Sequence, residues 1–138
     1  MTMRRTSVLL VEDEELISEF ISDALSESGF NVHAVQDGET ALSYLESGAE
    51  VDVLFTDINL LGPMDGATLA ARAREHRPEL PIVYCSGHYS PSELPPPVPR
   101  SVFVKKPYNP KELCRLLARL TSESALEPAF QGSRPGLF

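Results

Sequence analysis

The feature that most constrains the fold is an apolar run that ends in a carboxylate. The run VDVLFTD ends at Asp57, SVLLVED ends at Glu12 and Asp13, and SVFVKKP reaches Lys106. Short runs rich in Val and Leu are typical of strands buried on both faces of a parallel sheet. In open α/β sheets, ligands bind outside the carboxyl ends of such strands. The pattern therefore predicts three acids and one lysine at a single sheet edge, where they would suit a divalent cation and an anion.

Strand-like and helix-like segments alternate along the chain. Predicted strands cover residues 8–11, 30–35, 51–57, 81–85 and 101–105. Alternation of this kind predicts βαβ units with right-handed crossovers, which place helices on both faces of a parallel sheet. We therefore expect an α/β protein with a flavodoxin-like, doubly wound five-stranded parallel sheet in the order 2-1-3-4-5.

Two helices carry distinct signals. The last one has a start signal, with Asn109 as N-cap, Pro110 at the first position and Glu112 completing a capping box. The first has apolar residues at helical spacing, predicted to form one stripe, and Gly29 is its predicted stop. The predicted stripe consists of Leu16, Ile17, Phe20, Ile21, Ala24 and Leu25.

The connection before the fifth predicted strand interrupts the alternation of strands and helices. The segment HYSPSELPPPVPR contains five prolines. An interior proline removes a backbone donor and costs a helix about 3 kcal/mol. A fourth helix is therefore predicted to be short or missing.

The chain of 138 residues is long enough for one domain with a core. We expect that domain to cover residues 1–120. From residue 121 onward the periodicity is lost and Ser, Pro and Gly increase, which predicts a flexible tail over 121–138.

Charge and cysteine usage exclude several functions. A net charge of −8 argues against direct binding of nucleic acid, and Arg72, Arg74 and Arg77 are expected to form a solvated helix face. The apolar run after Arg5 is too short for a signal peptide or membrane span. The two cysteines show neither a disulfide framework nor metal-ligand spacing, which favours a cytoplasmic protein.

Each polar group at the predicted edge also has an ordinary explanation. Asp13 could cap the first helix, Ser86 could belong to a turn, and Lys106 could lie at a solvated strand end. These explanations weaken when the groups are taken together, because each follows a different predicted strand.

Residues 6 to 120 resemble the receiver domain of two-component response regulators. The matching motifs are Glu12-Asp13 after the first strand, Asp57 after the third, Ser86 after the fourth and Lys106-Pro107 after the fifth. The loop DINLLGPMDG is also similar to the family's. The Pro-rich connection resembles a receiver subgroup with a Phe-Ala-Thr-Gly-like signature and a degenerate fourth helix.

The resemblance implies a role for each motif residue. Asp57 would be the phosphoacceptor, and Mg²⁺ would be held by Asp13, Asp57 and the backbone carbonyl of Asn59, with Glu12 acting through a water. Ser86 and Lys106 would bind the phosphoryl group, with a cis bond before Pro107.

Signal output is implied in the same way. Ser86 and Phe103 match the pair that switches on phosphorylation, although Phe103 could instead be a core aromatic, the less favoured of the two interpretations. Asn59 and His88 match positions that tune the lifetime of the phosphorylated state, although His88 could equally be a bystander.

The function expected from the resemblance is a single-domain receiver rather than an enzyme. It would take a phosphoryl group from a histidine kinase or phosphotransfer protein, act on a further protein, and exist as a monomer or weak homodimer. The alternative is a Mg²⁺-dependent phosphohydrolase with an Asp nucleophile, but Asn59 stands where such an enzyme needs an acid. A flavodoxin-like cofactor binder is less favoured, because acids after the first strand would repel a phosphate.

Overall fold

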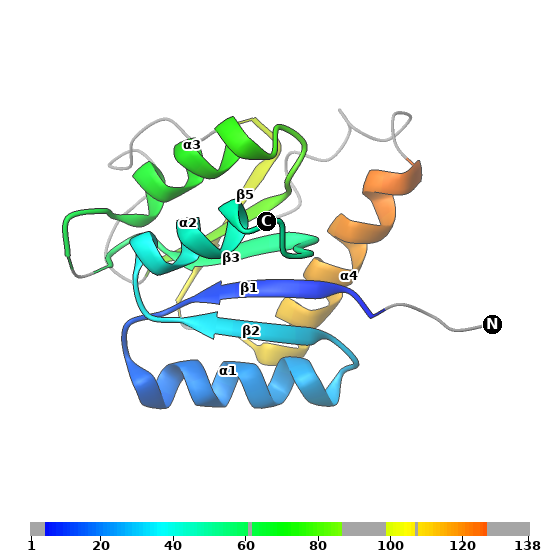
Figure 1. Ribbon diagram of the computed structural model, residues 1–138. Coiled ribbons are helices and arrows are strands. Elements are labelled where there is room, and N and C mark those ends of the chain that lie inside the picture. Colours follow the sequence, from blue (N-terminus) through cyan, green and yellow to red (C-terminus); the bar gives the residue numbers. More distant parts are fainter. Residues whose placement is uncertain (1–4, 61, 87–98, 107, 127–138) are drawn as a thin grey trace.

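The structure, a computed structural model, describes residues 5–60, 62–86, 99–106 and 108–126. In these residues, five parallel strands form one sheet, with two helices on each face (Figure 1). The strand order β2-β1-β3-β4-β5 confirms the predicted topology. The elements are β1 (Ser7–Val11), α1 (Glu15–Glu27), β2 (Asn31–Val35), α2 (Gly38–Glu46), β3 (Val53–Asp57), α3 (Gly66–His76), β4 (Ile82–Ser86), β5 (Ser101–Lys105) and α4 (Pro110–Leu126).

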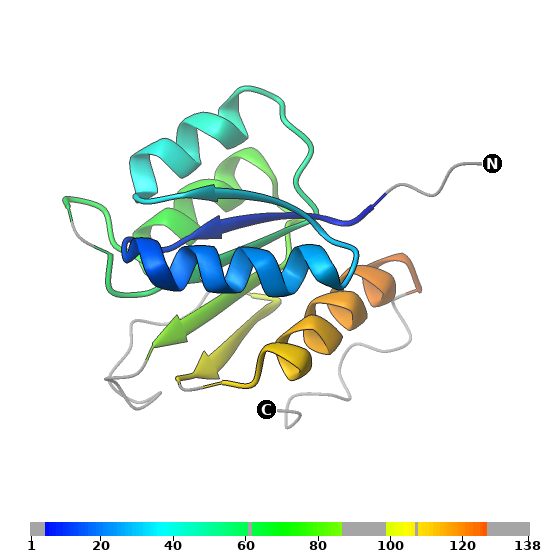
Figure 2. The same ribbon diagram turned by 90° about the horizontal axis from the view of Figure 1, so that it is seen from below.

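The core has two layers, one on each face of the sheet. Along β1, Val8 and Leu10 belong to the layer beneath α1 and α4, whereas Leu9 and Val11 belong to the layer beneath α2 and α3. This division follows from the alternation of side chains along a strand. Figure 2 shows α1 and α4 together in front of the sheet. The described part of the chain therefore forms a three-layer sandwich.

The predicted strands are buried to different degrees. All five residues of β1, β3 and β4 are buried, as expected for central parallel strands. The same expectation was wrong for β5, where four residues are half-buried and Lys105 is exposed. The reason is position, since β5 pairs only with β4 and forms one edge of the sheet.

Local signals set most of the helix boundaries. Asp37 and Asp65 cap α2 and α3, each accepting a hydrogen bond from the backbone N–H three residues later. Asn109 accepts a hydrogen bond from the backbone N–H of Lys111, which confirms the predicted start of α4. Gly29 follows the end of α1 with φ +97°, a conformation that glycine adopts at low cost.

The predicted apolar stripe of α1 is only partly correct. Ile21 and Leu25 are buried, but Leu16 and Phe20 are 80% and 61% exposed. A stripe of paired residues at 16–17, 20–21 and 24–25 is wider than the line of contact between a helix and a flat sheet. The sheet covers one side of that stripe and leaves the other side in solvent.

Arg74 and Arg77 do not form the expected solvated face. Arg74 donates hydrogen bonds to the carbonyls of Leu80 and Arg100, and Arg77 donates to those of Leu45 and Ala49. Both guanidinium groups therefore tie the end of α3 to neighbouring backbone, which for Arg77 includes the last turn of α2.

The last helix differs from expectation in length. α4 continues to Leu126, six residues beyond the predicted domain boundary. Thr121, where the tail was expected to begin, donates its hydroxyl to the carbonyl of Leu117 one turn earlier. The rest of the predicted tail lies outside the described residues, as does the segment 87–98 for which a short or missing fourth helix was predicted.

The lengths and hydropathy of the helices bear on whether any of them could insert into a membrane. No helix in the described residues is both long enough and apolar enough to cross a membrane.

Candidate functional site

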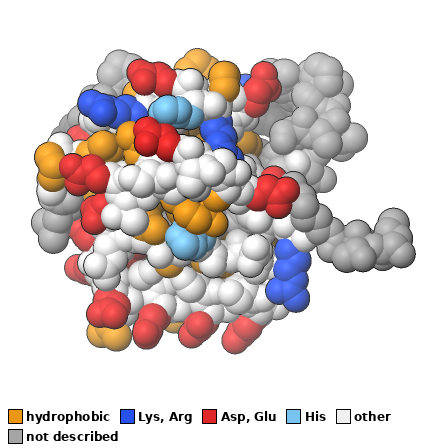
Figure 3. Space-filling model, in the orientation of Figure 1, with side chains coloured by type: hydrophobic (Ala, Val, Ile, Leu, Met, Phe, Trp, Pro, Cys, Tyr) orange, Lys and Arg blue, Asp and Glu red, His pale blue; other side chains and the backbone are white. Residues whose placement is uncertain are grey.

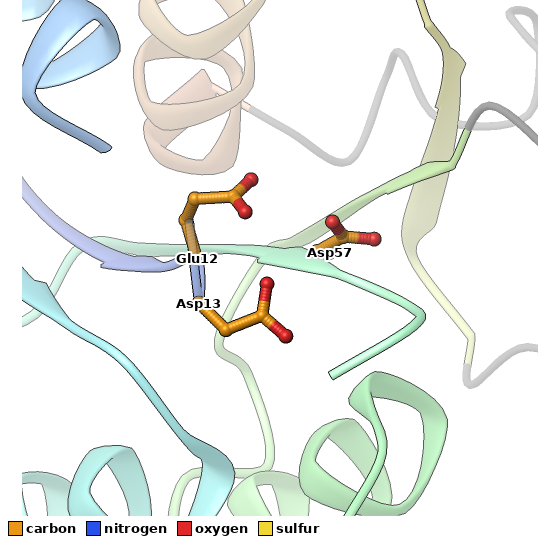
Figure 4. A group of neighbouring side chains, drawn as sticks. All are labelled: Glu12, Asp13 and Asp57. Carbon is orange, nitrogen blue, oxygen red and sulfur yellow. The ribbon is translucent and has the colours of Figure 1, made fainter. Parts of the chain in front are cut away.

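The acids and the lysine predicted to meet at one sheet edge do so. Glu12 and Asp13 follow β1, Asp57 is the last residue of β3, and Lys106 follows β5. Each of the three acids offers a carboxylate oxygen, and these oxygens lie within 4.8 Å of one another. Figure 4 shows the three carboxylates approaching a common space from two neighbouring strands. The topology assembles this group, because β1 lies beside β3 in the sheet.

Lys106 supplies the positive charge of this group. Its Nζ lies 2.9 Å from Asp57 Oδ2 and 3.7 Å from Glu12 Oε1. Burial on its own would lower the pKa of Lys106, but the hydrogen bond to Asp57 and the nearby negative charges raise it overall. Lys106 therefore remains a cation at neutral pH and offsets part of the repulsion among the acids.

Glu12 is the most deeply buried of the acids, with 3% of its surface exposed. Burial raises its pKa above the ordinary value, while the hydrogen bond from the backbone N–H of Glu14 and the charge of Lys106 act in the opposite direction. That N–H donates to Glu12 Oε2 over 3.0 Å. Because Glu14 is also the N-cap residue of α1, the turn that starts the helix holds the Glu12 carboxylate in place. Asp13 is not the helix cap.

The Asp57 carboxylate is held from two sides. Lys106 donates to Oδ2, and the backbone N–H of Asn59 donates to Oδ1 over 3.1 Å. The second bond turns the chain back after β3 and places residue 59 beside the acids. Only 7% of Asp57 is exposed, so little of the residue meets solvent.

Gly66 also shapes the site, although the sequence analysis assigned it no role. Its backbone N–H donates to the carbonyl of Ile58 over 2.9 Å. A Cβ added at this position would overlap the backbone carbonyl oxygen of Asp57 and lie 2.9 Å from Ile58 Cα. The start of α3 can therefore pack against the end of β3 only if residue 66 is glycine. The signal available in the sequence was a glycine immediately after a capping Asp.

The predicted switch residues lie on β4 and β5. Ser86 ends β4 and is fully buried, and its carbonyl accepts a hydrogen bond from the backbone N–H of Lys106. Phe103 is half-buried and packs against the core layer beneath α2 and α3. Its register partner on β4 is Tyr84. His88 and Pro107, for which roles were also predicted, lie outside the described residues.

The donor set indicates which metals this site could hold. Three carboxylates offer oxygen ligands, which Mg²⁺ and similar hard cations prefer. Cys85, the register partner of Asp57, does not add a soft ligand. Burial strongly raises the pKa of its thiol, so the thiol stays protonated at neutral pH. The residues present therefore fit a hard divalent cation.

Comparisons with known proteins agree on one family. A family model described as "Response regulator receiver domain" matches residues 8–118. The chain is similar to the sensor kinase CckA of Brucella abortus, with 33% identity over 78% of this chain and 12% of that protein. It is also similar to the response regulator receiver protein CpdR of the same organism, with 30% identity over 82% of this chain and 94% of that protein.

A solved structure extends this similarity to the fold. The crystal structure of a response regulator receiver protein from Sinorhizobium medicae WSM419 matches with a TM-score of 0.81 and 35% identity. The match covers 88% of this chain and 98% of that one. Coverage of the curated relatives is uneven, since the chain spans 12% of CckA and 25% of the nitrogen assimilation regulatory protein NtrX of Azorhizobium caulinodans.

Proposed function

The chain belongs to the response regulator receiver domain family, a family of phosphoacceptors, and we propose that Asp57 is the residue that receives the phosphoryl group. One observation carries this assignment. Asp57 is the carboxylate that contacts Lys106 at hydrogen-bond distance and also lies within reach of the other two acids.

In the proposed reaction, a carboxylate oxygen of Asp57 attacks the phosphorus of the donor. A P–O or P–N bond to the leaving group breaks as the new P–O bond forms, and the product is an acyl phosphate. Lys106 would remain close to the transferred oxygens and neutralise part of their charge. Positioning and charge stabilisation are the main contributions that a protein makes to phosphoryl transfer. Water then cleaves the acyl phosphate and restores the carboxylate.

A magnesium ion fits the remaining charge. Asp13 and Asp57 would hold it directly together with the backbone carbonyl of Asn59, and Glu12 would act through a bound water. When bound, the ion supplies positive charge that offsets the clustered carboxylates and the incoming phosphate oxygens. The carboxylate donor set supports this proposal.

We assign the output of the domain to Ser86 and Phe103. The hydroxyl of Ser86 would bind the phosphoryl group, and Phe103 would then turn further into the core. The half-buried state of Phe103 supports this role, because a fully packed aromatic would have no room to move. Asn59 and His88 remain the proposed positions that tune the lifetime of the acyl phosphate.

The proposed phosphodonor is a histidine kinase or a phosphotransfer protein, and the output is binding to a further protein. Membership of the receiver domain family supports the proposed phosphodonor. Cys85 and Cys114 are both free, which is consistent with the reducing cytoplasm where we expect the domain to work.

The direct test is phosphorylation by a small-molecule donor. Purified protein is incubated with acetyl phosphate and MgCl₂, and the mass increase of one phosphoryl group is measured against an Asp57→Asn control. We expect stoichiometric labelling that needs Mg²⁺ and is lost in the variant. Labelling that persists in Asp57→Asn would place the acceptor elsewhere.

The same assay addresses the alternative of a phosphohydrolase. Multiple turnovers of a phosphate ester by the wild-type protein would favour that alternative. We expect none, because Asn59 cannot protonate a leaving group as an acid at that position would.

A further inference from the structure

Four acidic residues form a row along α1. They are Glu15, Glu19, Asp23 and Glu27, each four residues after the last, and all four are exposed. Residues at this spacing are neighbours on a helix surface. Figure 3 shows acidic side chains following one another along the edge of the molecule where α1 lies.

Three basic residues form a matching row along α4. They are Lys111, Arg115 and Arg119, again at four-residue spacing and all exposed. In the described part of the chain, none of the seven side chains in these two rows takes part in a hydrogen bond or ion pair. Each row therefore presents its charge to solvent.

The two rows weaken the helices that carry them. Like charges four residues apart are destabilising on a helix surface. Glu27 stands in the last turn of α1 and Lys111 in the first turn of α4, where each has the wrong sign for the helix dipole. Among the row residues that stand in a terminal turn, Glu15 alone has the favourable sign. Helix stability therefore accounts poorly for these rows, whereas a surface of opposite charge would offset the repulsion within each row.

The rows share one surface of the molecule. α1 and α4 cover the same face of the sheet (Figure 2), and Cys114 Sγ lies 3.9 Å from the carbonyl oxygen of Ala24 between them. The exposed side chains of Leu16 and Phe20 lie next to the acidic row on α1. This surface, which we call the α1–α4 face, thus combines an acidic row, a basic row and two apolar side chains.

We propose that the α1–α4 face binds a second copy of this chain in a two-fold symmetric dimer. A two-fold axis that bisects the angle between α1 and α4 (Figure 2) places α1 of each copy along α4 of the other. Both acidic rows then meet basic rows, and the Leu16 and Phe20 side chains become covered. Two-fold interfaces use the same surface on both copies and must be self-complementary, as this face is in charge. The dimer neither requires nor involves phosphorylation at Asp57.

The test uses charge reversal in each row. One variant carries Glu19→Lys and Asp23→Lys, and the other carries Lys111→Glu and Arg115→Glu. Sedimentation velocity measures the mass of each protein over a range of concentrations in about 50 mM salt. We expect the wild type to dimerise and its dissociation constant to rise at least tenfold in about 500 mM salt, because exposed ion pairs are screened. We expect each variant alone to be a monomer.

The decisive sample is an equimolar mixture of the two variants. In the proposed geometry, one interface of the mixed dimer pairs the two reversed rows and the other pairs the two native rows. The mixture should therefore regain a dimer, with a dissociation constant within about threefold of the wild type. A partner of a different kind, such as a basic helix of another protein, does not produce this recovery.

A control variant distinguishes an effect of the α1–α4 face from an effect of net charge. Glu39→Lys with Glu75→Lys changes the charge by the same amount on α2 and α3, where both side chains are exposed. This control should dimerise like the wild type. The proposal is overturned by a wild type that stays monomeric, by a dimer that tolerates both reversals, or by a mixture that stays monomeric. Far-UV circular dichroism and acetyl phosphate labelling of all variants confirm that each is folded.

Discussion

Replacing Asp13 by Asn should stabilise the metal-free protein. The substitution keeps the shape of the side chain and removes one of three clustered negative charges. Two unit charges 4.8 Å apart repel by about 3.5 kcal/mol at an effective dielectric constant of about 20. Asp13 is half-exposed and Lys106 already offsets part of the repulsion, so the net gain is smaller. We expect the free energy of unfolding in EDTA to rise by about 1–2 kcal/mol.

Magnesium should reverse the order of stability of the wild type and Asp13→Asn. A ligand that binds only the folded state adds about 1.4 kcal/mol to stability at ten times its dissociation constant. The wild type should gain this amount on addition of MgCl₂, because the ion replaces repulsion among the acids with attraction. Asp13→Asn has lost a proposed ligand and should gain less than about 0.5 kcal/mol at the same concentration.

Urea unfolding followed by far-UV circular dichroism measures both effects, since the chain has no Trp for fluorescence. Each protein is unfolded in EDTA and in MgCl₂, with CaCl₂ as a second hard cation. The reasoning is refuted if Asp13→Asn is less stable than the wild type in EDTA and both proteins respond equally to MgCl₂. That result would mean that Asp13 is held by its own contacts and takes no part in metal binding.

Three other substitutions test how the fold supports the site. Gly66→Ala should lower the free energy of unfolding by about 1–3 kcal/mol and slow labelling of Asp57, because the added Cβ overlaps the Asp57 carbonyl oxygen; unchanged rates would contradict this. Asp37→Ala should cost about 1 kcal/mol at pH 7 through the lost helix cap. Hydrogen bonds from the backbone and side chain of Thr40 lower the pKa of Asp37. The stability difference between the two proteins should therefore persist above about pH 4 and shrink as the pH falls through the lowered pKa. Their urea unfolding midpoints should converge over the same pH range. Leu25→Ala should cost about 2–5 kcal/mol in urea unfolding, whereas Leu16→Ala on the same helix should change stability by less than about 0.5 kcal/mol.

The sequence by itself determined the strands, their order in the sheet and the acids at one edge. Apolar runs that end in acids are local signals, and the rules for parallel βαβ units leave few ways to arrange them. Asp57 and Lys106 could therefore be placed together although they are 49 positions apart in the sequence. The cap of α4 was also readable, because Asn109 accepts a hydrogen bond from the backbone N–H only two residues away.

Only the tertiary structure decided which side of each element is covered. Leu16 and Leu25 are the same residue type on one helix, yet one is exposed and the other buried, because the line of contact depends on how α1 lies on the sheet. The role of Gly66 depends on the approach of α3 to the end of β3, and no local pattern encodes that distance. Burial and close approach are properties of pairs of elements, so they arise only when the whole chain has packed.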